Sequence, residues 1–163
     1  MRIIGLDPGL RNTGWGVIES VGNRLMHVAD GVITTINSEA VAIRLADLHR
    51  HLEALLEQFH PDEAAVEETY VNRNPTSTLR LGQARGVVLL APALAGIPVA
   101  EYGAMAVKKS VVGYGHAEKD QVGMMVRRLL PAAQLKRADA ADALAVAICH
   151  AHHRATTRNW AAV

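Results

Sequence analysis

The sequence predicts an α/β fold in which a mixed sheet carries helices on both faces. Three strand-like segments come first, at residues 2–7, about 13–20 and about 24–36, and turns at Pro8-Gly9 and Gly22-Asn23 join them. Helical and strand-like segments then alternate. A meander of three antiparallel strands followed by such alternation is typical of a sheet with both antiparallel and parallel pairs.

The size of the chain agrees with one such domain. Its 163 residues are 50% hydrophobic, enough for one buried core and too few for two ordinary domains. No internal repeat or linker interrupts it. We expect a single domain over residues 1–163, with residues from about 154 to 163 as a loose tail.

The elements after the meander follow from hydrophobic spacing. Apolar residues three and four apart between Val41 and Phe59 predict a helix, which Asn37 or Ser38 can cap and Pro61 ends. A strand near 64–68 and a polar loop follow. The remaining segments are a helix at about 75–90, a strand at 97–102, and helices near 117–130 and 138–153.

Several functional classes are excluded by simple features. The longest apolar stretch, Val87 to Ala95, contains Pro92 and is far shorter than the roughly 20 residues of a membrane span. No basic leader precedes an apolar segment, so we expect no secretion signal. The single cysteine, Cys149, fits a reducing cytoplasm and is interpreted as a small core residue. We therefore expect a cytoplasmic protein with no membrane association.

Charge is strongly segregated along the chain. Residues 1–68 contain 5 Lys and Arg against 11 Asp and Glu, whereas the rest contains 12 against 5. No acid occurs from Thr69 to Ala100, where Arg73, Arg80 and Arg85 lie. A phosphate-binding surface and an ordinary solvated basic face are equally consistent with this pattern.

Carboxylates stand where a soluble domain rarely places charge. Asp7 ends the first strand, Glu67 ends the apolar run before it, and Asp139 and Asp142 lie among alanines on one helical face. Each has an ordinary alternative: Asp7 as a turn residue, Glu67 or Glu68 as an exposed strand end, and Asp139 as a helix cap. Because strand side chains alternate, only one of Glu67 and Glu68 can join Asp7.

Convergence of these acids would need a compensating cation. Uncompensated, the cluster repels itself and is driven toward protonation. Carboxylate oxygens are ligands suited to Mg²⁺ or Mn²⁺, and two such ions suit in-line displacement at phosphorus. The crowding of His150, His152 and His153 near the chain end, without a cysteine pattern, is instead typical of a frayed polar helix end.

An ordered set of motifs resembles the RuvC-type crossover junction endodeoxyribonucleases, the bacterial Holliday junction resolvases. The resemblance runs from residue 2 to about 153. It is carried by Gly5-Leu6-Asp7-Pro8-Gly9, Thr13-Gly14-Trp15-Gly16, Ala65-Val66-Glu67, Leu81-Gly82-Gln83-Ala84-Arg85-Gly86, Val111-Val112-Gly113, Ala117-Glu118-Lys119 and Ala138-Asp139-Ala140-Ala141-Asp142-Ala143-Leu144.

The resemblance implies a ribonuclease-H-like fold and a homodimer that makes paired, Mg²⁺-dependent nicks in two like-polarity strands of a four-way DNA junction. It assigns the acidic tetrad to Asp7, Glu67, Asp139 and Asp142, with Mg²⁺, two ions per subunit, as cofactor and Mn²⁺ as a substitute. Some relatives carry His at the position of Asp139 and Gln at that of Glu68. RuvA and RuvB are the partners it implies.

The resemblance also assigns residues that contact DNA. Lys108 and Lys119 fall at positions near the scissile phosphate, and Tyr70 falls where the family presents an aromatic ring to the junction centre. The ordinary alternatives are that Lys108 and Lys119 are solvent-exposed surface charges and that Tyr70 is a loop residue that packs over the core. The full set of expected DNA-binding residues is Tyr70, Arg73, Arg80, Arg85, Lys108, Lys109 and Lys119.

Three other functions compete with resolution of junctions. Residues 7–14 faintly resemble the first phosphate loop of actin-like sugar kinases and ATPases, but the chain has no second such loop or lobe. A junction-binding module without catalysis would not need all four acids. A ribonuclease-H-like nuclease that acts on RNA is the nearest enzymatic alternative.

Overall fold

The computed structural model describes residues 1–68 and 74–161, the last five of these by their backbone alone. The strands are β1 (Arg2–Asp7), β2 (Asn12–Val21), β3 (Arg24–Thr34), β4 (Glu63–Glu68) and β5 (Val99–Gly103). The helices are α1 (Val41–Phe59), α2 (Pro75–Leu94), α3 (Ala104–Val112), α4 (Lys119–Leu129) and α5 (Ala138–Ala161).

The five strands form one mixed sheet in the order β3-β2-β1-β4-β5. The first three strands pair antiparallel as a meander, and β4 and β5 then continue the sheet parallel to β1. Because β1, β4 and β5 run the same way, their carboxyl ends meet at one edge of the sheet. The predicted mixed sheet is confirmed.

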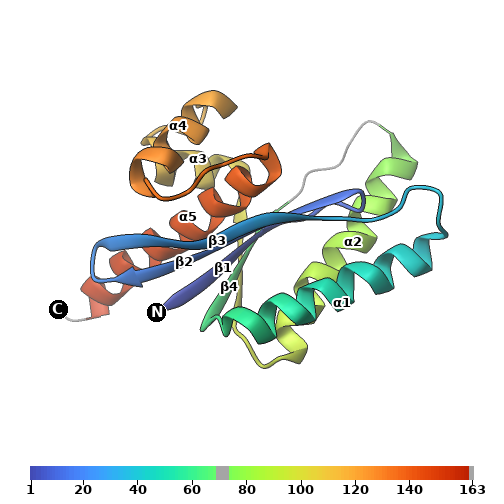
Figure 1. The fold of residues 1–163 in the computed structure, drawn as a ribbon. Coiled ribbons are helices and arrows are strands. Elements are labelled where there is room, and N and C mark those ends of the chain that lie inside the picture. The colour runs from blue at the N-terminus through green and yellow to red at the C-terminus, as the bar shows by residue number, and fades with distance from the viewer. Residues whose placement is uncertain (69–73, 162–163) are drawn as a thin grey trace.

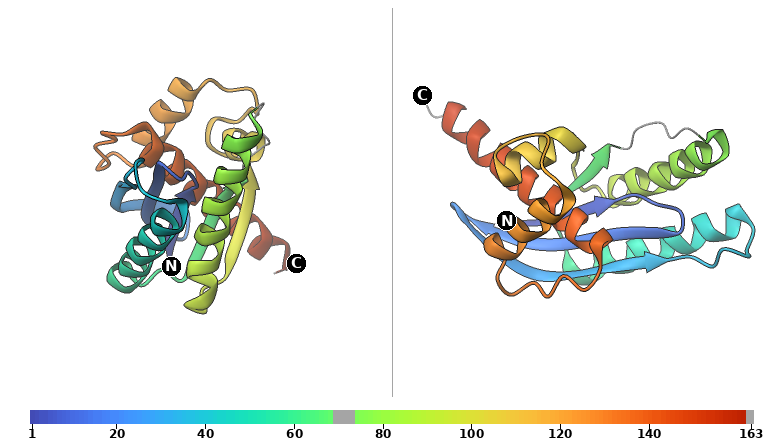
Figure 2. Two further views of the ribbon diagram at one scale, coloured as in Figure 1. Left: turned by 90° about the vertical axis from the view of Figure 1, so that its right-hand side faces the viewer. Right: turned by 90° about the horizontal axis from the view of Figure 1, so that it is seen from above.

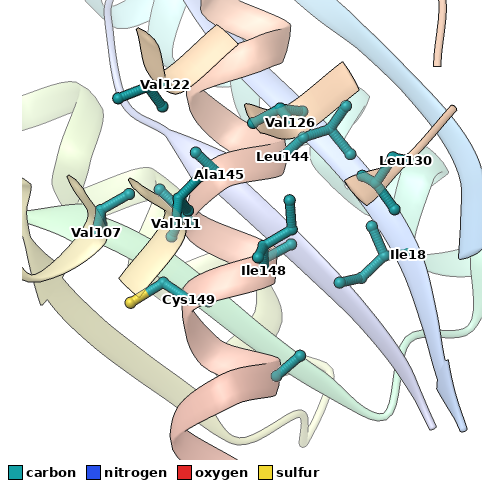
Figure 3. Packing of buried hydrophobic residues seen from close by; sticks show 14 of the residues in the cluster. Ile18, Val107, Val111, Val122, Val126, Leu130, Leu144, Ala145, Ile148 and Cys149 are labelled. Atoms are coloured by element: carbon teal, nitrogen blue, oxygen red, sulfur yellow. The ribbon is translucent and has the colours of Figure 1, made fainter. Parts of the chain in front are cut away.

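Helices cover both faces of the sheet, as expected (Figures 1 and 2). Helices α1 and α2 lie on one face over a core that includes Ile4, Leu6, Leu48 and Val88. Helix α5 crosses the other face, and α3 and α4 pack on its outer side. Figure 3 shows this second core, in which Leu144 and Ile148 of α5 contact side chains from the sheet and from the outer helices. Helix α5 is therefore enclosed from both sides.

Several predicted boundaries differ from the structure. No side chain caps α1, because its N-cap residue is Ala40 rather than Asn37 or Ser38, and Asn37 accepts a hydrogen bond from Arg44. Helix α2 continues through Pro92 and ends two residues later, since proline lacks only one amide donor there. Helix α3, which carries Lys108 and Lys109, was not predicted. The backbone expected to form a loose tail from residue 154 is helical as far as Ala161.

Candidate active site

Two acids lie side by side at the carboxyl edge of the sheet. Asp7 is the last residue of β1 and Glu67 lies near the end of β4, and these strands pair through Leu6 and Val66. The two side chains form a hydrogen bond with each other. Glu67 rather than Glu68 faces Asp7, as the alternation of strand side chains predicts, and Glu68 is exposed.

Two glycines allow α5 to bring a third acid to this pair. A Cβ atom on Gly5 would lie 2.1 Å from the carbonyl oxygen of Ala143, and one on Gly14 would lie 2.0 Å from that of Asp139. Both distances are far below van der Waals contact, so the helix backbone rests directly on the sheet at these points. As a result Asp142, in the second turn of α5, lies beside the strand acids.

The environment of this cluster opposes its ionisation. The pKa of Asp7 is raised from 3.8 to about 8, first by burial and then by the charges of Glu67, Asp142 and Asp139. Burial, followed by the charge of Asp142, also raises the pKa of Glu67, while the hydrogen bond from Asp7 and the nearby lysines lower it. The raised pKa favours the protonated Asp7 carboxyl, whose O–H donates a hydrogen bond to the Glu67 carboxylate.

Two lysines share the cleft with these acids. The cleft has a volume of about 380 Å³, and its polar lining consists of Asp7, Glu67, Glu68, Asp142, Lys108 and Lys119. Lys119 Nζ lies 3.0 Å from Asp142 Oδ2, and this hydrogen bond is the main cause of the raised pKa of Lys119. Lys108 reaches the same space from α3. The cleft thus combines a carboxylate cluster with two lysines, side chains of the kinds that suit a cation and a phosphate respectively.

Asp139 occupies a more peripheral position than the other three acids. Its charge raises the pKa of Asp7, so it is close to the cluster. Its carboxylate, however, lies 3.6 Å from Arg137 and lines a neighbouring cleft rather than the one that holds Asp7.

The expected DNA-binding residues are distributed unevenly around these clefts. Arg80 lines the neighbouring cleft, and Lys109 is exposed on α3 without lining the catalytic one. Arg85 lies on α2 in an ion pair with Glu101 of β5, so its guanidinium is already neutralised. Tyr70 and Arg73 lie outside the described residues.

The donor set of the cluster fits a hard divalent cation. Asp7, Glu67 and Asp142 offer carboxylate oxygens, and burial together with mutual repulsion keeps Asp7 protonated in the absence of a cation. Among residues 1–68 and 74–161, no three acidic, histidine or cysteine side chains already converge with metal-binding geometry. One reason is that Asp142 is turned toward Lys119. Metal binding would therefore replace protein contacts and release protons.

A second polar cluster, missed from the sequence, lies at the other end of β4. His150 is only 5% exposed and lies between Glu63 and Tyr102, with Nε2 2.6 Å from Glu63 Oε2 and Nδ1 2.8 Å from the Tyr102 hydroxyl. Arg154 completes it with a 2.7 Å contact to Glu63 Oε1. We call Glu63, Tyr102, His150 and Arg154 the histidine clamp.

The interpretation of the terminal histidines as a frayed polar helix end is wrong. His150 belongs to the clamp, His152 contacts Ser110, and the His153 ring lies 5.2 Å from that of Tyr102. One pattern in the sequence indicates that His150 is buried. It follows Val146 by four residues and Ala147 by three, and so falls on the buried face of the helix.

The family to which the chain belongs follows from comparison with known proteins. Residues 3–150 match the family model described as crossover junction endodeoxyribonuclease RuvC. The chain is 71% identical to the protein of that name from Granulibacter bethesdensis, over 99% of this chain and 90% of the relative. It is 66% identical to that of Paramagnetospirillum magneticum, over 99% and 97%.

Solved structures agree with these sequence matches. The Thermus thermophilus RuvC bound to a Holliday junction substrate superimposes with a TM-score of 0.90 at 35% identity, covering 96% of each chain. The yeast mitochondrial Holliday junction resolvase, at 15% identity and a TM-score of 0.74 over 97% of this chain and 80% of that one, shares the fold. The chain therefore belongs to the crossover junction endodeoxyribonuclease RuvC family.

Proposed function

We propose that this protein is a structure-selective endodeoxyribonuclease that resolves four-way DNA junctions by paired, symmetric nicks in strands of like polarity, during recombination and DNA repair. The observation that carries this proposal is the buried carboxylate cluster at the ends of β1 and β4, in a chain of this family. The junction-bound relative, which covers nearly the whole chain, supports the substrate class.

The four acids have distinct places in this proposal. Asp7, Glu67 and Asp142 hold Mg²⁺, two ions per subunit, and Asp139 contributes from the edge of the cluster; Mn²⁺ can substitute. Such ions, when bound, supply an activated attacking water and stabilise the leaving oxygen. The proton on the Asp7 carboxyl, which is hydrogen-bonded to Glu67, must leave before both carboxylates can bind a cation, so binding is coupled to pH.

The lysines act on the DNA backbone. Lys119 neutralises Asp142 in the protein alone, and it would be available to a phosphate oxygen if that carboxylate held a cation instead. Lys108 approaches the same cleft from α3 and binds a phosphate beside it. Lys109, Arg73 and Arg80 extend the basic surface, Arg85 would join it only by leaving its ion pair with Glu101, and Tyr70 stacks on a base at the junction centre.

The working form is proposed to be a homodimer of single-domain subunits, because paired nicks need two catalytic centres at a fixed separation. Helix α2 supports this proposal. Leu79 and Leu90 are exposed on it, and nothing lies near a Cβ atom built on Gly82 or Gly86.

We propose that the protein acts in the cytoplasm and that its partners there are RuvA and RuvB. Within the described residues, no helix is long and apolar enough to cross a bilayer.

One experiment tests the activity directly. The purified protein is incubated with a four-way junction, a linear duplex and an RNA–DNA hybrid, each with and without Mg²⁺. We expect paired cuts in the junction alone, and only with the metal. Preferred cutting of the hybrid would indicate a nuclease that acts on RNA, and tight junction binding without cutting would indicate a non-catalytic binding module.

Substitutions of the acids test the roles assigned to them. Asp7→Asn, Glu67→Gln, Asp139→Asn and Asp142→Asn should each abolish cleavage and keep junction binding, since less negative charge eases the approach of DNA. Glu68→Gln is the matched control and should be mild. The reverse pattern for Glu67 and Glu68 would contradict the assigned strand register.

A further inference from the structure

A second cleft adjoins the carboxylate cluster and has the opposite charge. It has a volume of about 430 Å³ and lies between the β1–β2 turn, the segment before α1 and the first turns of α2. These segments gather at one end of the molecule in Figure 1. Its charged lining consists of Arg11, Arg44 and Arg80, with Asp139 on the side toward the catalytic cleft.

Arg44 is the most informative residue of this cleft. It is only 5% exposed, yet none of the ion pairs within the described part of the chain involves it. By contrast, the exposed Arg50 on the same helix is paired with Asp47. A buried cation is costly unless an anion compensates it. The structure therefore leaves a buried positive charge without the carboxylate that normally accompanies it.

Neutral oxygens hold the Arg44 guanidinium in a fixed orientation. Its Nε donates to Thr35 Oγ1 and its Nη2 to Asn37 Oδ1, both at 3.0 Å, and Thr35 in turn donates to the Leu10 carbonyl. A guanidinium has five N–H donors, so these two bonds leave others for a ligand that enters the cleft. A planar fork oriented in this way suits the oxygens of a phosphate.

The surroundings of Arg44 also favour an anion. Arg11 and Arg80 are exposed at the edge of the cleft, and its one acid, Asp139, lies 3.6 Å from Arg137 outside it. Helix α2 begins here with no acid in its first turn, and Ser77 of that turn lines the cleft. The positive end of the helix dipole therefore adds to the charge of the arginines.

We propose that this arginine cleft binds a backbone phosphate of the DNA strand that is cut, next to the scissile phosphate. This inference rests on the proposed function. Asp139 links the two sites, because it lines the arginine cleft and also raises the pKa of Asp7. A strand whose scissile phosphate lies in the carboxylate cleft thus places a neighbouring phosphate by Arg44. The subsite fixes the register of the strand without reading its sequence.

The test removes the charge of one DNA phosphate, or of one arginine, or of both together, and compares the effects. Four-way junctions carry a single methylphosphonate, an uncharged phosphate analogue, at successive positions on either side of the cut. Junction affinity is measured without metal, and single-turnover cleavage with Mg²⁺. We expect the wild-type protein to lose roughly tenfold in affinity at one position beside the cut, as for a lost charged hydrogen bond. In Arg44→Lys the loss at that position should fall below about twofold, because the contact with the guanidinium is already gone, and in Arg11→Gln and Arg80→Gln it should be smaller than in the wild type, because each removes a positive charge beside the same phosphate.

Arg24→Gln is the matched control. Arg24 is exposed at the start of β3, whereas the cleft lies beyond the other end of that strand, roughly 30 Å away at 3.3 Å per residue. This variant removes the same charge and should keep the full methylphosphonate loss. Arg44→Lys retains the charge of the buried side chain but lacks the planar guanidinium, so it should bind the junction more weakly than the wild type. Its melting temperature is measured in parallel to check that the variant is folded.

The outcomes separate this inference from the proposed function. Equal methylphosphonate losses in wild-type, Arg11→Gln and Arg80→Gln proteins, with normal cleavage of the unmodified junction, would overturn the phosphate subsite alone. A wild-type protein that neither binds nor cuts the unmodified junction would overturn the proposed function and the subsite with it.

Discussion

The two ends of β4 carry glutamates in opposite electrostatic situations. Glu63 and Glu67 lie four residues apart, hence on the same face of one strand, and both face α5. At Glu63 the helix supplies His150 and Arg154, so the charge is matched by protein groups. At Glu67 the helix supplies Asp142, another acid, and burial together with this like charge raises the pKa values of Asp7 and Glu67.

This difference shows how one strand and helix pair can serve stability and chemistry at once. The histidine clamp ties the far end of α5 to β4 and β5 with satisfied hydrogen bonds. The catalytic end is left electrostatically incomplete, which prepares it for cations and phosphate from outside. The acid at the clamp end is matched by two basic side chains, whereas the buried strand acids at the other end face a further acid and have strongly shifted pKa values.

The largest expected effect is a difference in junction cleavage between variants of Glu67 and Glu63. Glu67→Gln should lower junction cleavage by about 10²-fold or more, because it removes a carboxylate from the metal-binding cluster. Glu63→Gln makes the same chemical change on the same strand and should leave the cleavage rate within about twofold at a temperature where the variant is folded. Single-turnover cleavage measures both. Similar losses in the two variants would contradict the division of the strand into two functional ends.

The second prediction concerns the stability of the catalytic end as pH changes. Because the pKa of Asp7 is about 8 in the folded protein and 3.8 ordinarily, its protonated form stabilises the fold below pH 3.8, and that contribution is lost as pH rises to about 8. Asp7→Asn cannot lose a proton and should be more stable than wild type at pH 9 by roughly 2 to 4 kcal/mol. The two should differ little at pH 4.

Thermal or urea unfolding in EDTA across this pH range measures the effect, with Glu68→Gln as control. Addition of Mg²⁺ should stabilise the wild type more than Asp7→Asn, with release of protons detectable in a weakly buffered solution. A constant difference between the two proteins from pH 4 to pH 9 would show that Asp7 is not the group that titrates.

The third prediction addresses the clamp end. Glu63→Gln should destabilise the protein by about 1 to 3 kcal/mol, because His150 and Arg154 lose their shared carboxylate. The position is 15% exposed, so water compensates part of the loss. Urea unfolding measures it. A stability equal to that of wild type would mean that the clamp contributes no net energy to the fold.

The smallest expected effect comes from the hydroxyl of Tyr102. Tyr102→Phe keeps the ring and removes the 2.8 Å hydrogen bond to His150, so we expect a loss of about 1 kcal/mol. Burial raises the pKa of Tyr102 to about 12, which keeps the hydroxyl protonated throughout the neutral range. Ionisation of this hydroxyl should therefore make no contribution to any difference between the losses at pH 6 and pH 8. A marked pH dependence would assign the titration to another clamp residue.

The sequence alone predicts the catalytic end better than the clamp end. Asp7 and Glu67 are visible because strand ends and side-chain alternation are local patterns, and Asp142 because an acid stands out among alanines on a buried helix. The predicted mixed sheet and its order of elements follow from the same local periodicities. Asp139 was grouped with Asp142 by helical spacing, but spacing does not reveal that Arg137 holds it toward another cleft.

The clamp and the arginine cleft depend on contacts between distant parts of the chain. His150 lies 87 residues from Glu63 and 48 from Tyr102, so no local pattern joins them. Arg44 lies four residues before Leu48 on the buried face of α1, but the contacts with Thr35 and Asn37 that hold it come from the folded segment before the helix. Helix α3 was missed because it is a nine-residue segment directly after β5, too short for a clear period.

The contact of α5 with Gly5 and Gly14 has a consequence for sequence divergence. Main-chain atoms set the spacing between the strand acids and Asp142, so larger or smaller core residues elsewhere on α5 can be exchanged without altering it. A single methyl group at either glycine would instead push the helix outward and separate the acids. Substitutions at Gly5 and Gly14 should therefore lower activity although neither residue contributes a side chain to the site.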